Sequence, residues 1–376
     1  MNKLTSSLIL AGVISVPSVA MADGKVPTLS DVLGASGVTM SGYIDAGYTN
    51  MDSTGLFTTG GATRVFDAPN AVAGKKFDSF NLNQVSVTVA KQPTSGFGGV
   101  VNLTGGQDSS VIGSVGAGAG TQHLDFTQAY VSYATGPMTA ILGKFATLAG
   151  AEVIPSMSDT NYSRSILFGY AIPFTHTGAR VTYAASDTVS LIAGINNGWD
   201  QVQDQNTDKT LELGFTAAPS KMISLAGSYY GGKEMAAANG NRSLVDLVAT
   251  INATDALSFV LNYDNGSQEN ALAVGSKAKW DGLAVYANYM LSDMWRVSFR
   301  TEYLNDKQGY RTGTGVPMKW SENTLTLAYM PAKSFEFRGE VRGDHSNNGV
   351  AAGFKQADGT SKSNQTSFGL EAIYKF

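Results

Sequence analysis

The 376-residue chain contains no cysteine, which excludes disulfides and thiolate chemistry and is compatible with an oxidising compartment. Charged residues make up only 15% of the chain, well below the roughly 25% of soluble domains. The net charge of −4 provides no basic excess, which argues against a nucleic-acid partner. No stretch reaches the roughly 18 consecutive apolar residues of a membrane-spanning helix. The mean hydropathy is nevertheless only −0.05, so the chain resembles neither a soluble enzyme nor a helical membrane protein.

The motifs of common enzyme classes are also missing. G-x-S-x-G, H-E-x-x-H and Walker sequences do not occur, and the chain has only three histidines. Segments 197–200 and 204–208 could hold a divalent cation, but 204–208 lacks the glycine and the spaced glutamate of a calcium loop, which favours solvated acidic residues. We therefore expect no catalytic residue, no metal site and no cofactor.

The N-terminal residues indicate export. Residues 1–22, MNKLTSSLILAGVISVPSVAMA, have a basic start, an apolar centre and a small-residue exit. This pattern predicts a secretory signal peptide cleaved after Ala22, with an apolar first helix as the alternative. Residues 23–37 place Leu29, Val32 and Leu33 at helical spacing. They predict a short periplasmic segment that is either helical or an N-terminal arm.

From residue 38 onward the dominant pattern is a two-residue alternation of apolar and polar side chains, which is typical of strands. We count about sixteen such segments, with a range of roughly 14 to 18. They are 38–48, 85–89, 97–103, 129–133, 139–145, 179–183, 189–195, 211–217, 223–229, 245–251, 257–263, 283–291, 295–303, 325–329, 335–343 and 368–376.

The connections between these segments alternate between short turns and long polar loops. Segments 92–96 and 135–137 are examples of turns, whereas 49–79, 231–241 and 264–278 are examples of loops. This alternation is typical of bacterial outer-membrane proteins. The sequence therefore predicts an all-β fold: a single transmembrane antiparallel up-and-down β-barrel over residues 38–376, with short periplasmic turns and long extracellular loops.

A soluble β-sandwich is the alternative fold, and two features argue against it. Sixteen strands in one meander exceed the usual size of a sandwich. Aromatic residues also recur at the ends of the apolar faces, as a membrane-interface belt requires. They are Tyr48, Tyr133, Tyr183, Tyr229, Tyr263, Trp295, Tyr303, Tyr329 and Tyr374. A barrel of this size has a lumen wide enough for water, so we expect its polar face to line a channel.

Charged residues of inward parity are concentrated in the last quarter of the chain. Because an arginine facing lipid at mid-membrane would cost about 2–4 kcal/mol, these residues are expected to point into the lumen. The predicted pore-lining and selectivity residues are Arg296, Arg300, Glu302, Glu336, Arg338, Glu340 and Arg342, joined by Asp45, Lys144 and Arg180. Asp344, Glu371 and Lys375 belong to the same wall. Two interpretations remain open: structural ion pairs, or a charge filter for solutes.

Residues 146–174 form a long, partly apolar loop after the fifth predicted strand. A solvated loop would not need Val153, Ile154, Ile166, Leu167 and Phe168, so we expect it to fold inward and constrict the pore. Its charged candidates are Glu152, Asp159 and Arg164. An outward flap at a subunit contact is the alternative.

Several motifs carry a resemblance to a known family. They are Gly143-Lys-Phe145, Glu152, Asn161-Tyr-Ser163, Pro173-Phe-Thr-His-Thr-Gly178 and the segment 197–200. At these positions, and over most of the chain, the sequence resembles the OmpL-like β-barrel porin family. The resemblance implies an outer-membrane channel and brings no catalytic residues with it.

Taken together, the sequence predicts a Gram-negative outer-membrane porin that passes small hydrophilic solutes and ions. Its expected partners are the lipid bilayer with its outer-membrane lipids, the outer-membrane assembly machinery and, in a homotrimer, further copies of itself. The terminal Phe376 is the candidate assembly signal, because it completes the alternation of the last segment without a polar tail. A non-conducting surface or adhesion protein and a barrel hydrolase are the alternatives. Ile373 breaks the alternation, and the sequence offers no reason for it.

Overall fold

A computed structural model describes residues 29–53, 66, 77–116, 123–234, 240–349, 354–356, 358 and 360–376. The chain divides into two units, Met1–Ser36 and Gly37–Phe376. The described part of the first unit is a helix, α1 (Leu29–Ser36), and the expected signal peptide lies outside the described residues. No helix in the described ranges is long and apolar enough to cross a membrane.

The second unit is a closed antiparallel barrel of 16 strands in which neighbours along the chain pair and the last strand closes on the first. This confirms the predicted fold. The strands of the barrel are β1 (Thr39–Met51), β2 (Phe77–Lys91), β3 (Gly96–Gly105), β4 (Leu124–Thr135), β5 (Met138–Ala146), β6 (Thr175–Ser186), β7 (Val189–Asn196), β8 (Thr210–Ser220), β9 (Ile223–Lys233), β10 (Asn241–Asn252), β11 (Leu257–Glu269), β12 (Lys277–Ser292), β13 (Trp295–Asp306), β14 (Met318–Ala332), β15 (Phe335–Ser346) and β18 (Asn364–Lys375). A small hairpin, β16 (Phe354–Lys355) and β17 (Ser361–Lys362), lies in the connection before β18.

Closure of the barrel involves the end of the chain. The backbone of Phe376 pairs with that of Gly42 through two hydrogen bonds of 2.9 Å, one in each direction. A Cβ on Gly42 would lie 2.5 Å from Cζ of Phe376, so the terminal ring covers a glycine. Closure satisfies the backbone groups that an open sheet edge would expose to lipid.

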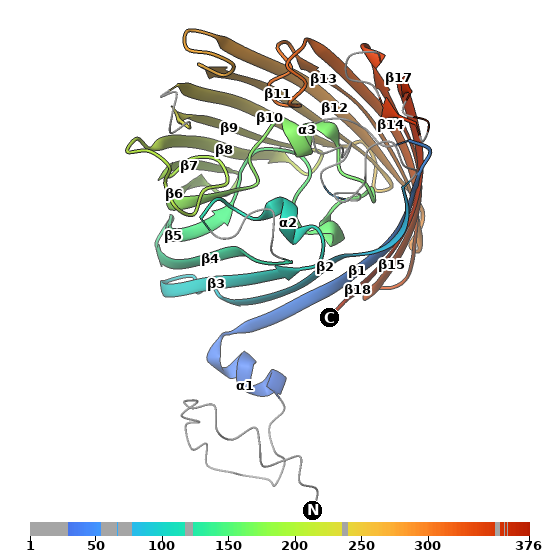
Figure 1. Ribbon diagram of the computed structural model, residues 1–376. Helices are drawn as coiled ribbons and strands as arrows, with labels where there is room; N and C mark the ends of the chain where they lie inside the picture. The colour runs from blue at the N-terminus through green and yellow to red at the C-terminus, as the bar shows by residue number, and fades with distance from the viewer. Residues whose placement is uncertain are drawn as a thin grey trace, which may run out of the picture. The chain divides into compact units, whose positions relative to one another are not determined.

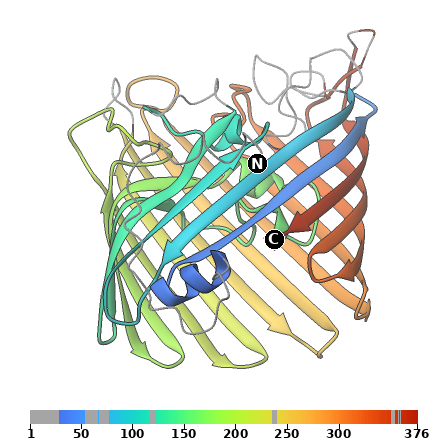
Figure 2. The same ribbon diagram turned by 90° about the horizontal axis from the view of Figure 1, so that it is seen from below.

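The two ends of the barrel differ as predicted, with short turns at one end and longer connections at the other (Figure 2). Several strands extend beyond their predicted bounds. Expected loops 231–241 and 264–278 shrink to the residues between β9 and β10 and between β11 and β12, and β2 begins at Phe77 rather than near residue 85.

The sequence pattern predicts these strands too short because the alternation of apolar and polar side chains inverts near the long-loop end of the barrel. In β12, Trp280 is fully buried on the inner side while Lys279 and Asp281 lie on the opposite face. In β14, Trp320 is buried in the same way beside the exposed Lys319. Beyond the lipid layer the outer face meets water and the inner face packs under loops, so the polarity of the two faces is exchanged.

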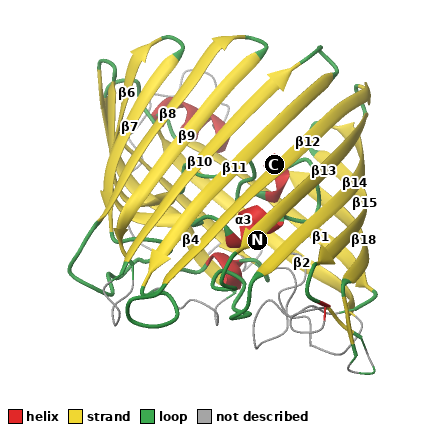
Figure 3. Ribbon diagram, turned by 90° about the horizontal axis from the view of Figure 1, so that it is seen from above, coloured by secondary structure: helices red, strands yellow, loops and turns green. Residues whose placement is uncertain are grey.

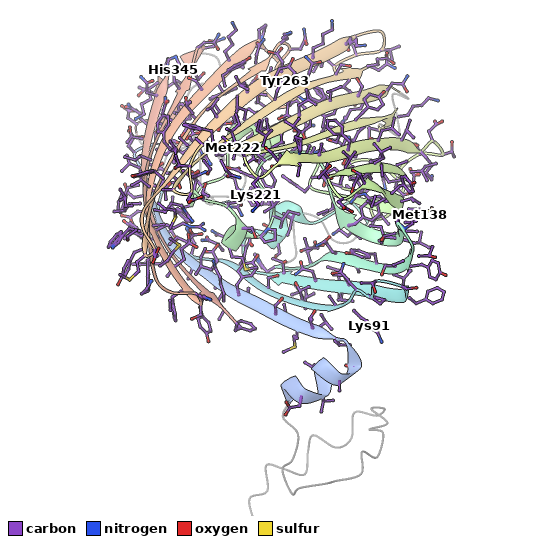
Figure 4. The ribbon with its side chains drawn as sticks, turned by 180° about the vertical axis from the view of Figure 1, so that it is seen from behind. Lys91, Met138, Lys221, Met222, Tyr263 and His345 are labelled. Carbon is purple, nitrogen blue, oxygen red and sulfur yellow. The ribbon has the colours of Figure 1, made fainter. Side chains whose placement is uncertain are left out.

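The outer face of the barrel carries large exposed apolar side chains, among them Phe80, Phe97 and Val131. Aromatic residues gather at its ends, where Trp295 and Tyr329 have ring centroids 4.6 Å apart. Figure 4 labels three further large exposed side chains that are apolar or aromatic, Met138, Met222 and Tyr263. An apolar band with aromatic ends is the expected outer surface of a membrane-spanning barrel.

The interior of the barrel is occupied by two connections. Residues 147–174, here named the inward loop, contain a 3₁₀ turn, η1 (Ser156–Ser158), and a short helix, α3 (Ile166–Tyr170). The connection after β3 contains α2 (Ser109–Ile112). Both α2 and α3 lie within the ring of strands (Figures 1 and 3).

The apolar residues of the inward loop are buried with one exception. Ile154, Ile166, Leu167 and Phe168 belong to an interior apolar cluster with 5% or less of their surface exposed. Val153, which we expected beside them, is 41% exposed.

Ile373 also belongs to the interior. It is fully buried on the inner side of β18, in register with Asp45 of β1 and Glu336 of β15. Its break in the sequence pattern therefore places an apolar side chain among inward-facing charges.

Candidate functional site: the inward loop and its charged wall

The wall of β13, β14, β15 and β18 holds the inward loop through side chains that point into the barrel. Arg300, on β13, is fully buried. Its Nη1 donates to Glu152 Oε1 at 2.7 Å and to the carbonyl of Ser163 at 2.6 Å, and its Nε donates to Glu322 Oε2 at 2.9 Å. One guanidinium thus connects two strands of the wall to two points of the loop.

Arg338, on β15, holds a second stretch of the loop. Its guanidinium donates to three loop carbonyls, those of Asp159 at 2.7 Å, Asn161 at 3.1 Å and Ser156 at 3.2 Å. The same side chain pairs with Glu336 at 2.8 Å and Glu371 at 2.9 Å. Its five N–H groups, fixed in one plane, suit this number of partners.

Two carboxylates of the wall bind backbone N–H groups of the loop. Glu340 accepts from Tyr162 at 2.8 Å and from Ser163 at 3.0 Å. Glu302 accepts from Ile166 at 2.6 Å and Leu167 at 3.0 Å, the first two residues of α3. These N–H groups have no partner within the helix, so Glu302 satisfies them. Its negative charge also interacts favourably with the positive end of the helix dipole.

The remaining charges of the row complete this network. Arg342 donates to the carbonyl of Arg164 at 2.7 Å and pairs with Asp344 at 2.6 Å. Arg296 pairs with Glu336 at 2.7 Å and donates to the carbonyl of Thr160 at 3.3 Å. The wall charges selected from the sequence are therefore brought together, and they are engaged with one another and with the loop.

The loop's own charged residues are bound inside it. Glu152 accepts from Ser165 N at 2.7 Å as well as from Arg300. Arg164 pairs with Asp159 at 3.1 Å and donates to the carbonyl of Ile154 at 2.9 Å. Burial raises the pKa of Asp159 to about 7, although Arg164 opposes the shift.

Close packing adds to these polar contacts at the seam where the barrel closes. A Cβ on Gly369 would lie 2.4 Å from Cδ1 of Tyr162, and one on Gly47 would lie 2.7 Å from its Oη. Tyr162 Oη is also 2.8 Å from Thr49 Oγ1. Two glycines on β1 and β18 therefore form a flat seat for the Tyr162 ring.

Sequence reasoning missed several of the residues that hold the loop. Gln84 donates to the carbonyl of Ile154 at 3.0 Å, but it lies just before the predicted second strand. Glu322 precedes the predicted segment 325–329 by three residues. Tyr230 and Asn262 accept from Leu148 N at 2.9 Å and Ala151 N at 3.1 Å and are neutral, so a search for charge passed over them. Correct strand extents, with inward parity applied to neutral as well as charged side chains, would have identified all four.

Two predicted residues, Lys144 and Arg180, lie away from the main cluster. Lys144 pairs with Asp125 at 2.9 Å, and Arg180 pairs with Glu212 at 2.6 Å. Arg180 also donates to the carbonyl of Ala146 at 3.0 Å, where the inward loop begins. Asp45, by contrast, adjoins the cluster: it is 1% exposed, accepts from Asn83 at 3.0 Å and interacts with Glu371 of β18.

Space inside the barrel lies mostly beside uncharged side chains, with Asp187 at the edge of one of two cavities. A cavity of about 90 Å³ separates loop residues Ile154, Pro155 and Met157 from β1–β4. The strand side chains around it are neutral, including Tyr43, Thr88, Asn102 and Gln128. A second cavity, of about 350 Å³, adjoins the turn ends of β7–β10 and is lined by Ser190, Thr216, Ser224 and Thr250.

Neither the histidines nor the acidic segments form a metal site among the described residues, where no group of three or more His, Asp or Glu side chains is suitably placed. His176 is buried and stacks on Tyr230 with centroids 4.6 Å apart. His345 is an exposed residue of β15. The Asp200 carboxylate accepts from Phe174 N and Thr175 N at 2.9 and 2.8 Å, which fixes the end of the inward loop.

A closed barrel of 16 strands with an exposed apolar outer surface and an internal loop after the fifth strand has the architecture of an outer-membrane porin. A family model described as "Putative beta-barrel porin-2, OmpL-like" matches residues 37–376, and the chain belongs to this family. It is thus an outer-membrane β-barrel of the porin class. A search of curated proteins finds no match.

Solved structures of other outer-membrane proteins share the fold. The channel DcaP of Acinetobacter baumannii has a TM-score of 0.61 at 13% identity, covering 90% of this chain and 97% of that one. The trimer form of OmpT of Vibrio cholerae has a TM-score of 0.60 at 12% identity, with 90% and 99% covered. An anion-selective porin from Comamonas acidovorans has a TM-score of 0.59 at 12% identity, also with 90% and 99% covered.

Proposed function

We propose that this barrel is a passive diffusion channel for small hydrophilic solutes and ions, narrowed by the inward loop. The observation that carries the proposal is the attachment of that loop to the wall by buried side chains, with Arg300, Arg338 and Glu340 at its centre. A barrel of 16 strands has a lumen wide enough for water, and a loop bound at so many points to its inner wall permanently reduces the cross-section of that lumen.

We further propose that these charged residues act mainly through the position of the loop. Each of the three is 2% exposed or less, so the guanidinium and carboxylate groups meet protein partners rather than passing solutes. Of the two interpretations left open by the sequence, structural ion pairing therefore has the stronger support. The passage itself would run beside the neutral strands that face Ile154, Pro155 and Met157.

Two partners remain proposals. The trimer form of OmpT of Vibrio cholerae, which shares the fold, supports a homotrimer for this chain. The terminal Phe376, a residue that is 51% exposed, would be available to the outer-membrane assembly machinery. No observation on the described residues favours the adhesion or hydrolase alternatives.

Recording from the purified protein in a planar bilayer tests the proposed function. We expect discrete steps of ionic current in potassium chloride, and a partial reduction of each step by small sugars that enter the passage. A barrel that inserts but never conducts would contradict the proposal and favour the surface-protein alternative.

A further inference from the structure

Two arginines meet over one indole ring at the long-loop end of the barrel. The guanidinium carbon of Arg242, on β10, lies 4.7 Å from the ring centroid of Trp199. That of Arg311, in the connection between β13 and β14, lies 5.1 Å from the same ring and 5.3 Å from Trp280. Cation–π contacts of this length are favourable, but they leave the two like charges close together.

The hydrogen bonds of these arginines involve neutral groups. Arg242 donates to Gln268 at 2.8 Å and to Tyr310 Oη at 3.1 Å. Arg311 donates through Nε to the carbonyl of Tyr170 at 2.5 Å. Within the described residues, neither guanidinium forms an ion pair with a carboxylate. This distinguishes them from Arg300, Arg338 and Arg342 of the wall.

The nearby carboxylates are bound to other groups. Asp306 accepts from Tyr310 N at 3.0 Å and from Thr312 N at 2.9 Å. Glu234 accepts from Trp199 N at 2.8 Å and from Thr210 Oγ1 at 2.7 Å. Asp200 accepts the two backbone N–H groups at the end of the inward loop. These acids shape the loops around the arginines. Asp200 and Asp306 offset part of the charge of Arg311, but neither forms an ion pair with it among the described residues.

The pKa of Arg311 is consistent with a guanidinium that has no carboxylate partner. Burial and the neighbouring Arg242 lower its pKa to about 10, so a positive charge is held there at a cost. Both arginines are only half-buried, and the Nη groups of Arg311 have no protein partner among the described residues. An incoming anion would find free N–H donors and would offset the repulsion between the two charges.

We propose that Arg242 and Arg311, held by Trp199, form a binding site for a small dianion carrying carboxylate or phosphate groups. Planar guanidinium groups suit these oxygens because they can donate two parallel hydrogen bonds to each. Lying at the long-loop end, the site would take such solutes from outside the cell before they reach the inward loop. The proposal rests on the proposed channel function and specifies a solute class for it.

Binding can be measured without transport, because only four tryptophans are present and two of them contact these arginines. Tryptophan fluorescence of the purified barrel is titrated with sodium succinate and with sodium phosphate, against sodium chloride at equal ionic strength. We expect a saturable change with one or both dianions and none with chloride. Saturation by succinate alone assigns a carboxylate solute, and saturation by phosphate alone assigns a phosphate solute.

Variants then connect the binding to the two arginines. The double substitution R242Q/R311Q should weaken it by at least about tenfold, because charge-assisted hydrogen bonds are lost. K209Q/K277Q is the matched control, since it removes two charges from exposed loop-side lysines that are already paired with acids. If the double variant does not give the heat-resistant folded band on a gel, R311Q alone is used, because Arg311 lies outside the strands.

Two results would overturn the site: no saturation by either dianion above the chloride control, or equal binding by wild type and R242Q/R311Q. Because the assay needs no current, its failure is distinct from failure of the channel. A conducting barrel without saturable binding refutes only the site, whereas saturable binding by a non-conducting barrel refutes only the channel.

Discussion

At the scale of single residues, the inward loop depends on the geometry of arginine rather than on positive charge alone. Arg338 reaches three loop carbonyls and two carboxylates from one planar group. A lysine has a single ammonium nitrogen and cannot span these partners. The same argument applies to Arg300, whose two ends contact Glu322 and Ser163.

We therefore predict that Arg338→Lys releases the loop although it keeps the charge. Each buried loop carbonyl left without its donor costs about 1–3 kcal/mol, and the cost should fall on the loop because the strands remain paired. Hydrogen–deuterium exchange should accelerate over residues 156–161 and stay slow in β13–β15. Lys362→Gln is the control, since the exposed Lys362–Asp52 pair contributes little. Unchanged exchange in Arg338→Lys would refute the anchoring role.

Asp159 makes the loop sensitive to pH. Its pKa in the folded protein, about 7, lies above the ordinary value of 3.8. The proton thus stabilises the folded loop at low pH, and this stabilisation is lost as the pH rises through about 7. Exchange over residues 150–165 should be slower at pH 5 than at pH 8, beyond the intrinsic effect of pH. Asp159→Asn should remove the difference, and a dependence that survives this substitution would assign it to another group.

The glycine seat predicts a steric effect at the seam. Gly369→Ala would place a Cβ 2.4 Å from Tyr162, so the ring must move and the loop should loosen with it. Adding Tyr162→Ala to Gly369→Ala should remove the clash, so the effects of the two substitutions should not be additive. Gly343→Ala is the matched control because its Cβ would meet nothing within 4 Å. The measurement is loop cleavage by a protease, and additive effects would contradict the seat.

At the scale of elements, the strands could be predicted and the loop contacts only in part. Alternation identified all sixteen barrel strands because lipid on one side and polar groups on the other impose a period of two. It failed where Trp280 and Trp320 reverse the pattern, and so shortened β12 and β14.

The residues of the candidate site could likewise be predicted from the sequence only in part. Sequence parity selected Arg300, Arg338 and Glu340 because buried charges are conspicuous in an alternating strand. It could not determine that these residues would contact 147–174, because the contacts join segments that are 177 or more residues apart for Arg338 and Glu340. The seat of Gly47 and Gly369 was also beyond reach, since a glycine in a strand carries no sign of what packs on it.

At the scale of the whole molecule, the last residue contributes to closure as well as to the proposed assembly signal. Deleting Phe376 removes two backbone bonds to Gly42 and the ring that covers it. We expect severalfold less folded barrel in the outer-membrane fraction of cells. Phe368→Ala is the control because it removes another exposed aromatic ring from the same strand.

Refolding of the purified variants into detergent separates the two contributions of Phe376. If the deletion refolds normally in detergent but fails to insert in cells, the ring acts through the assembly machinery. If it fails in both, closure itself requires it. Normal insertion in cells would refute the proposed signal.

The central claim is that the loop held by the charged wall narrows an aqueous passage through the barrel. The most direct measurement compares the single-channel conductance of the full chain with that of a chain lacking residues 150–165. The deletion should raise the conductance. In the chain with the deletion, the Arg300 guanidinium would face the open lumen, so adding Arg300→Ala should change the reversal potential. An unchanged conductance would place the loop outside the path of ions and contradict the account.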